Sequence, residues 1–379
     1  MSLMLKQLFS LFLSQGLRSL AVSFFSFFSA VYIYRQTNSL AAVFYFFLIL
    51  YIFKMIGVGL AENWALKFGL KKQMILGHFL TIVTGMFFAL SQKMTFSIWL
   101  AAVCWGLAIG FFWFGRHGLL AKFGGKDSWG QASGWAGAIE TLMVLTGPFL
   151  GGILINQFGY LGLFLGAIFL TILGMAVLKP APEEKTHKDV TFKEIFRLLL
   201  THKKMALTYF SRGGIEAVYS GGLILYLFFL VKKEIALGGF FSLSLILVAI
   251  VNLLIGKWVD KKGKKELIGF GAIVSFLVWT GRLFVKEIGG FLIFDVLERI
   301  GGIMLGIPLD VLSFQKAIDG GSTGRALLFR ETAITAGSIF ACLLLLLLSF
   351  LNLPLSFSFV FGSGLSLFPL LIAKDEKTG

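Results

Sequence analysis

The sequence predicts an all-α integral membrane protein, with twelve transmembrane helices arranged as two pseudo-symmetric six-helix bundles. Hydrophobic residues make up 57% of the 379-residue chain and charged residues only 14%, which is too apolar for a soluble domain with a hydrated surface. The apolar residues form runs that match a bilayer core, which a helix crosses in roughly 20 residues. A polar segment near the middle of the chain separates two halves with similar basic turns.

Polar or glycine-rich breaks divide the chain into twelve apolar segments. We expect helices, because hydrocarbon offers no partner to an unpaired backbone group. The first segment follows Lys6 as a signal peptide would, but its length and its polar residues Gln15 and Arg18 predict a retained span. The predicted spans are 8–33, 40–60, 74–90, 96–120, 131–155, 161–178, 205–231, 237–258, 267–285, 291–312, 326–351 and 355–373.

The distribution of basic residues predicts the orientation, because cytoplasmic loops carry an excess of lysine and arginine. With the N-terminus inside, most of the 34 basic residues fall in cytoplasmic segments. The outer loops then hold only Arg35, Lys93, Lys232, Lys233 and Lys286. We therefore expect both termini in the cytoplasm. The absence of an Asn-x-Ser/Thr sequon fits a bacterial cytoplasmic (inner) membrane.

The longest polar segment divides the chain into residues 1–178, a cytoplasmic linker at 179–204 and residues 205–379. Within the linker, Thr191 and Glu194 have the spacing of a capping box that opens a helix. Phe192, Ile195, Phe196 and Leu199 give this helix an apolar side. We expect it to lie along the inner surface of the membrane.

The two halves share a basic turn, which occurs at residues 62–72 and again at 256–265. Aligning Gly69 with Gly263 sets an offset of 194 residues, and this offset also pairs Arg18 with Arg212. An arginine at membrane depth is costly, so the arginine pair supports an internal repeat.

Twelve spans, a central cytoplasmic loop and a basic turn after the second span of each half resemble the major facilitator superfamily of secondary transporters. In the second half Gly256, Asp260, Gly263 and Lys265 match its loop signature. In the first half Leu66 stands at the position of the acid, and Glu62, one turn earlier, is the candidate substitute.

The resemblance implies a cytoplasmic latch. Asp260 would interact with the positive end of a helix, and Lys261 or Lys265 would reach an acid such as Asp310. We expect Arg116, with Glu62 and Asp310, near the cytoplasmic ends of the spans, either as gate pairs or as side chains that snorkel.

A second match lies in the fifth span, where Gly134, Gly147, Pro148, Gly151 and Gly152 resemble the antiporter signature of proton-coupled drug exporters. Met143 replaces one glycine of that signature. The glycines also suit close helix packing and the proline a bend, so both interpretations stay open.

Ionisable residues inside the predicted spans are the candidate functional residues, because an unpaired charge in hydrocarbon costs at least a few kcal/mol. Glu140, Glu298 and Glu331 are candidates for proton coupling, since a desolvated carboxylate exchanges a proton when its surroundings change. The alternative is a static ion pair between helices. Asp295 and Arg299, like Arg212 and Glu216, are four apart and pair locally.

In the superfamily, spans one, four, seven and ten line the central cavity. This resemblance places Arg18, Trp113, Arg212, Glu216 and Arg299, with Glu298, on or near it. Arg18 and Arg212 would hold an anionic group of the substrate, or each would neutralise a nearby glutamate. For Arg282 we expect a side chain that snorkels to the outer surface.

The expected function is secondary active transport of a small organic solute by alternating access. We expect coupling to protons, and export by proton antiport is one of the two directions of transport considered. Uptake of a small organic anion by a symporter or facilitator is the alternative, and a transport-inactive receptor or scaffold is an alternative of another class. We expect no cofactor, no metal, no nucleic-acid partner and a monomer in the bilayer. Nothing resembles a catalytic constellation, so an enzyme is not expected.

Overall fold

The computed structural model describes the chain except residues 1–2, 124–128, 186–191, 260–263, 320–322 and 374–379. Side chains of helical residues 3–8, 120–123, 129–141, 192, 249–259, 264, 307, 310–319 and 323 also lie outside the description.

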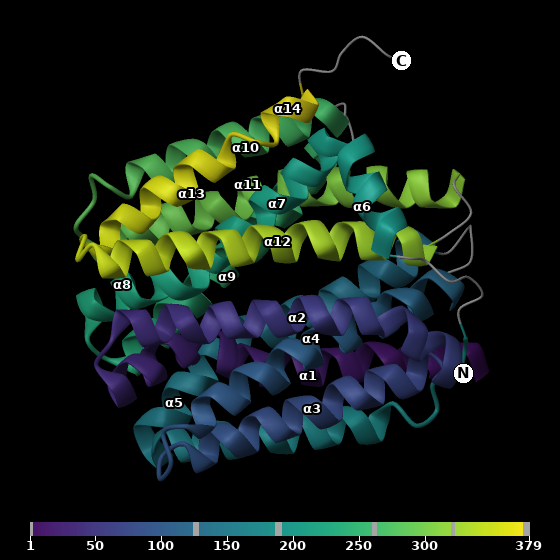
Figure 1. The fold of residues 1–379 in the computed structure, drawn as a ribbon, viewed down its shortest axis with the longest axis horizontal. Coiled ribbons are helices and arrows are strands. Elements are labelled where there is room, and N and C mark those ends of the chain that lie inside the picture. Colours follow the sequence, from purple (N-terminus) through teal and green to yellow (C-terminus); the bar gives the residue numbers. More distant parts are fainter. Residues whose placement is uncertain (1–2, 124–128, 186–191, 260–263, 320–322, 374–379) are drawn as a thin grey trace. The chain divides into compact units, whose positions relative to one another are not determined.

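The described residues form helices joined by short turns, and contain no strand (Figure 1). The elements are α1 (Leu3–Thr37), α2 (Leu40–Phe68), α3 (Leu70–Leu90), α4 (Ser97–Phe123), α5 (Trp129–Val177), α6 (Phe192–Thr201), α7 (Lys203–Ala217), the π-helix η1 (Val218–Leu223), α8 (Ile224–Val231), α9 (Glu234–Val259), α10 (Lys264–Gly281), α11 (Ile288–Asp319), α12 (Thr323–Phe350), the 3-10 helix η2 (Leu355–Phe357), α13 (Ser358–Ser366) and α14 (Leu370–Ala373).

Every predicted span overlaps described helix. The fifth and sixth spans both lie in α5, which has non-helical backbone at Gly159, with φ 67° and ψ −174°. The absence of a Cβ lets this residue adopt the conformation that separates the two spans. The seventh span is formed by α7, η1 and α8 in succession. Eight helical stretches of the described chain are long and apolar enough to cross a membrane.

The chain forms two compact units. Unit 1 contains Met1–Ala42, Ile49–Phe192 and Glu234–Gly239, and unit 2 contains Val43–Leu48, Lys193–Lys233 and Phe240–Gly379. In unit 1, α1 packs on α5, and α3 packs on α4 and α5. In unit 2, α7 packs on α12, and α10 packs on α11 and α13. Both units therefore pair their first span with their fifth and their third with their fourth.

The beginning of the linker is bound to unit 1. Leu70 N–H donates to the carbonyl oxygen of Glu184 over 2.7 Å, and Lys71 N–H donates to Glu183 Oε1 over 3.0 Å. The Lys71 ammonium also donates to the carbonyl oxygen of Lys179. The first N–H groups of a helix have no partner within that helix, so these bonds satisfy the N-terminus of α3.

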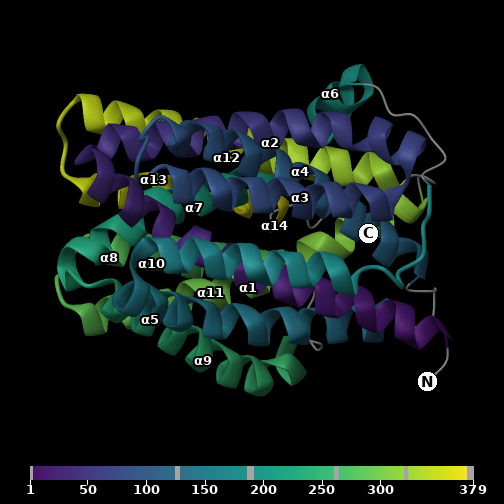
Figure 2. The same ribbon diagram turned by 90° about the horizontal axis from the view of Figure 1, so that it is seen from below.

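The helix α6 follows the linker at its other end (Figure 2), and from Lys193 onward it belongs to unit 2. Its residues Leu198 and Leu199 pack against a core cluster that includes Tyr209, Ile268 and Phe329. This cluster joins α7, α10 and α12 within the unit.

Helices α7 and α12 approach at two glycines. A Cβ added at Gly213 would overlap the carbonyl oxygen of Ile334, and one added at Gly337 would overlap the carbonyl oxygen of Phe210. The nearest atoms at both positions belong to the backbone, so no flexible side chain could move to make room for the added Cβ. The two helices can therefore lie this close only because neither residue has a side chain.

We predict that Gly337→Ala lowers the free energy of unfolding by about 1–3 kcal/mol, since the new methyl group forces α12 away from α7. The control is Gly302→Ala in α11, where an added Cβ meets no atom within 4 Å. Thermal unfolding of the purified protein in detergent measures both. Equal midpoints for the two variants would contradict the close-packing argument.

Candidate functional site

A cluster of buried charges in unit 2 is centred on Asp295 of α11, which is fully buried. Its carboxylate accepts hydrogen bonds from Tyr219 of η1 at 2.9 Å and Ser244 of α9 at 2.5 Å. Arg299 Nε, one turn further along α11, donates to it over 2.8 Å. Arg282, just after α10, places Nη2 3.8 Å from Asp295 Oδ1. One carboxylate on α11 is thus in contact with η1, α9 and the residue that follows α10.

The π-helical turn η1 positions Tyr219 at this cluster. Ile224 N–H donates to the carbonyl oxygen of Tyr219, five residues earlier, which is the π-helical spacing. The Tyr219 hydroxyl also accepts from Arg299 Nη2 over 2.6 Å while it donates to Asp295. A π turn shifts the side chains that follow it relative to an α-helix and often occurs at functional sites.

Glu298 lies on α11, close to this group, and is 8% exposed. Its Oε1 accepts from Ser275 Oγ at 2.7 Å and from Trp279 Nε1 at 3.1 Å, both on α10. Ser275 Oγ in turn accepts from Ser366 of α13. Glu298 Oε2 makes no hydrogen bond to the described part of the chain. The carboxylate is therefore buried with one oxygen satisfied by two neutral donors.

Arg282 contacts both parts of the cluster. Its guanidinium carbon lies 4.3 Å from the ring centre of Trp279, the residue that donates to Glu298, and its side chain is fully buried. Within the described residues, Nε and Nη1 have no hydrogen-bond partner. The prediction that Arg282 snorkels outward is wrong, because the side chain turns inward to Asp295 and Trp279.

In unit 1, the buried side chain of Arg18 lies on α1. Its guanidinium carbon is 3.8 Å from the ring centre of Phe112 on α4. His78 of α3 packs its ring on the same phenylalanine, with centroids 5.2 Å apart, and its Nε2 lies 3.1 Å from Ser14 Oγ. Phe112 therefore has a cation on one side and an imidazole in edge contact.

The sequence matches a model of the Major Facilitator Superfamily over residues 11–341. The chain belongs to this family. It is accordingly a polytopic integral membrane protein and a secondary transporter of small-molecule substrates.

Solved structures agree with this transporter fold. An auto inhibited POT family peptide transporter is 11% identical, with a TM-score of 0.76 and 98% of each chain covered. A D-xylose-proton symporter is 14% identical, with a TM-score of 0.73 and 97% of each chain covered. The human organic anion transporter MFSD10 (TETRAN) is 13% identical, with a TM-score of 0.72, and 99% of this chain and 100% of that chain are covered. No curated protein sequence matches this transporter.

The remaining predicted residues of this transporter are distributed over both units. Arg116 in unit 1 lies over the ring of Trp113, with its guanidinium carbon 4.8 Å from the ring centre. Arg212 in unit 2 faces Gly306 of α11, where an added Cβ would lie 3.7 Å from Arg212 Nη1. Glu216 is exposed.

Two predicted acids are buried outside the cluster. Glu331 is 7% exposed, and its Oε1 lies 3.8 Å from Nε of Arg330. Glu62 of α2 is 3% exposed. Gly69, with φ 98°, joins α2 to α3. The acid bonded to the first turn of α3 is Glu183 from the linker, which the sequence did not indicate.

Most of the second-half loop signature, and the proton-coupling candidate Glu140, lie outside the described side chains. Lys265 is half-buried at the start of α10. The other predicted side chains that lie outside the described residues are Gly134, Glu140, Gly256, Asp260, Lys261, Gly263 and Asp310.

The antiporter-type segment of α5 lies at a helix contact. An added Cβ would overlap Ser23 of α1 at Gly147 and Phe28 of α1 at Gly151. Gly152 and Pro148 are buried in the same helix. Packing against α1 accounts for Gly147 and Gly151, and packing against Ile235 of α9 accounts for Gly152. The antiport role stays a prediction.

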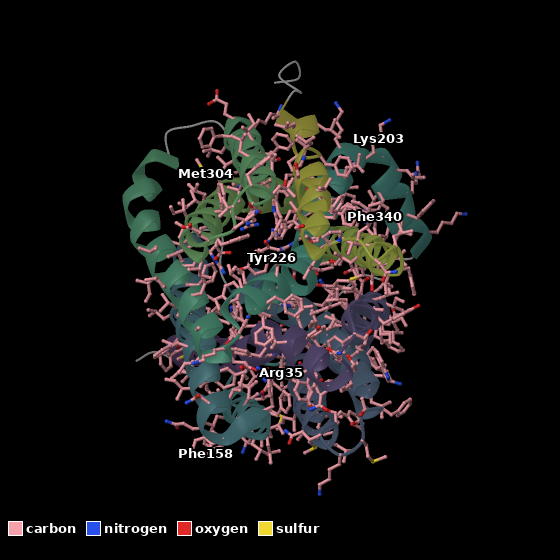
Figure 3. The ribbon with its side chains drawn as sticks, turned by 90° about the vertical axis from the view of Figure 1, so that its left-hand side faces the viewer. Arg35, Phe158, Lys203, Tyr226, Met304 and Phe340 are labelled. Atoms are coloured by element: carbon pink, nitrogen blue, oxygen red, sulfur yellow. The ribbon has the colours of Figure 1, made fainter. Side chains whose placement is uncertain are left out.

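We predict that Tyr219→Phe destabilises the protein by about 1.5–3 kcal/mol, because it removes a hydroxyl bonded to two charged groups. Tyr226→Phe, at a residue labelled in Figure 3, is the control. The Tyr226 ring packs on Phe291 and Phe359, with centroids 5.2 and 5.1 Å away. Thermal unfolding in detergent compares the two variants. A loss of the same size in both variants would show that the contacts of the Tyr219 hydroxyl with Asp295 and Arg299 add no stability beyond that of an ordinary hydroxyl.

Proposed function

We propose that this transporter couples the movement of a small organic solute to protons, and that Glu298 takes up and releases the proton. The observation that supports this most directly is the environment of its carboxylate. It is buried, one of its oxygens has no hydrogen bond to the described residues, and the other accepts only from neutral donors. A carboxylate in such surroundings gains or loses a proton readily when its environment changes.

Asp295 is less suited to that role. It accepts from Ser244 and Tyr219 and forms an ion pair with Arg299 at 2.8 Å. Hydrogen bonds that involve a charged donor are roughly twice as strong as neutral ones, and they favour the ionised carboxylate. Asp295 would thus remain an anion that holds the two arginines while Glu298 changes its charge.

Arg282 connects the two carboxylates. It lies 3.8 Å from Asp295 and stacks on the tryptophan that donates to Glu298. When Glu298 is ionised, the guanidinium is attracted to both acids. When Glu298 is protonated, Asp295 becomes its only acidic partner within this cluster. A proton on Glu298 would thereby change the packing of α10 against α11, which alternating access can use.

Export by proton antiport is the direction that the α5 segment favours, through its similarity to the antiporter signature at Gly147, Pro148, Gly151 and Gly152. Uptake of an organic anion would instead depend on Arg18 and Arg212, and their role in holding an anionic group stays a prediction.

Proteoliposomes with an imposed pH gradient test the proposal, with a solute first identified by its stabilisation of the purified protein. We expect wild-type protein to move protons only when the solute is present. Glu298→Gln should abolish this flux, because an amide cannot carry the proton, while solute exchange without a pH gradient continues. Glu287→Gln removes an exposed carboxylate just before α11 and should leave proton flux unchanged.

Solute transport by wild-type protein without any proton movement would refute the coupling. Proton flux that survives in Glu298→Gln would instead assign the proton to another residue.

A further inference from the structure

The short helix α6 has one face bound to unit 2. Ile195 is 4% exposed, and Leu198 and Leu199 pack against the core cluster around Tyr209. Glu194 forms an ion pair with Arg325 of α12. The helix is therefore fixed to the protein through Ile195, the two leucines and one acid.

A second face of α6 points away from that contact. Phe196 and Leu200 are each 64% exposed, and the basic residues Lys193 and Arg197 are exposed beside them. The four positions are spaced i, i+3, i+4 and i+7, so they form one stripe along the helix. The sequence predicted Phe196 on the same side of the helix as Ile195 and Leu199. In the structure Ile195 is buried and Leu199 packs against the core cluster, whereas Phe196 is exposed.

Two further basic residues follow the end of α6. Lys203, labelled in Figure 3, and Lys204 are exposed at the start of α7. The only acid between residues 193 and 204 is Glu194, which is paired with Arg325. This surface is thus strongly positive around two large apolar side chains.

We propose that the stripe formed by Lys193, Phe196, Arg197 and Leu200 binds anionic phospholipids at the membrane surface. Water alone disfavours exposed phenylalanine and leucine, and hydrocarbon alone disfavours lysine and arginine, whereas the bilayer interface accepts both on one helix. Phe196 and Leu200 lie between acyl chains, and the basic side chains contact headgroup phosphates. Clusters of four or more basic residues on an amphipathic helix favour anionic lipid, by about fivefold for each residue near the surface.

The test uses full-length Phe196→Trp protein in nanodiscs. Lipids with brominated acyl chains quench a tryptophan that they contact, and wild-type protein supplies the background from the eight native tryptophans. At equal mole fraction in phosphatidylcholine, brominated phosphatidylglycerol should quench the introduced tryptophan more strongly than brominated phosphatidylcholine does. Added salt should reduce this preference, because it screens the headgroup charges.

Lys193→Gln with Arg197→Gln, in the Phe196→Trp background, should reduce the phosphatidylglycerol preference severalfold. The control is Lys232→Gln with Lys233→Gln, which removes the same charge from an exposed turn elsewhere in the chain and should keep the preference. Leu200→Trp is an independent reporter on the same stripe if Phe196→Trp does not fold.

Three results would overturn the proposal. Absence of quenching at both positions would mean that the stripe faces water, another segment or a second protein. Equal quenching by the two lipids would mean apolar insertion without recognition of the headgroup. The same loss of preference in the control would mean that net charge, rather than this stripe, attracts the lipid.

Discussion

A charge held away from water needs directed partners, and the helices of unit 2 are arranged around that requirement. Asp295 brings η1, α9 and the end of α10 to α11, because each supplies one donor or cation to its carboxylate. Removal of this acid would leave Arg282 and Arg299 facing each other in a buried space. The charge of Asp295 is thus part of the packing of these helices.

The spans could be predicted because hydrocarbon requires long apolar helices, and each predicted span overlaps a described helix. The Asp295–Arg299 pair could also be predicted, since residues four apart share a helix face. Tyr219 was missed because α-helical periodicity does not hold across the π turn of η1. Arg282 was misplaced because its position near the end of a span says nothing of the inward contacts that α11 provides.

The basic turn of the first half shows a similar limit. The signature acid is replaced there by Leu66, and sequence spacing pointed to Glu62 as the substitute. The structure shows a further acid at this turn, because Glu183, more than a hundred residues later, accepts a hydrogen bond from the first turn of α3. A helix N-terminus attracts any nearby acid, whatever its distance along the chain. This contact cannot be predicted from the residues of the turn, because they do not indicate which distant segment of the chain returns to it.

The two anchored ends of the linker change what it does mechanically. Glu183 and Glu184 are bonded to α3 in unit 1, and unit 2 includes α6 from Lys193 onward. Eight residues, 185–192, separate these two points in the sequence, and a fully extended chain spans at most about 3.3–3.6 Å per residue. Eight residues therefore set an upper limit of roughly 28 Å on the length of this part of the linker. We expect a shorter linker to restrict the movement of the two units during transport, and a longer linker to be tolerated.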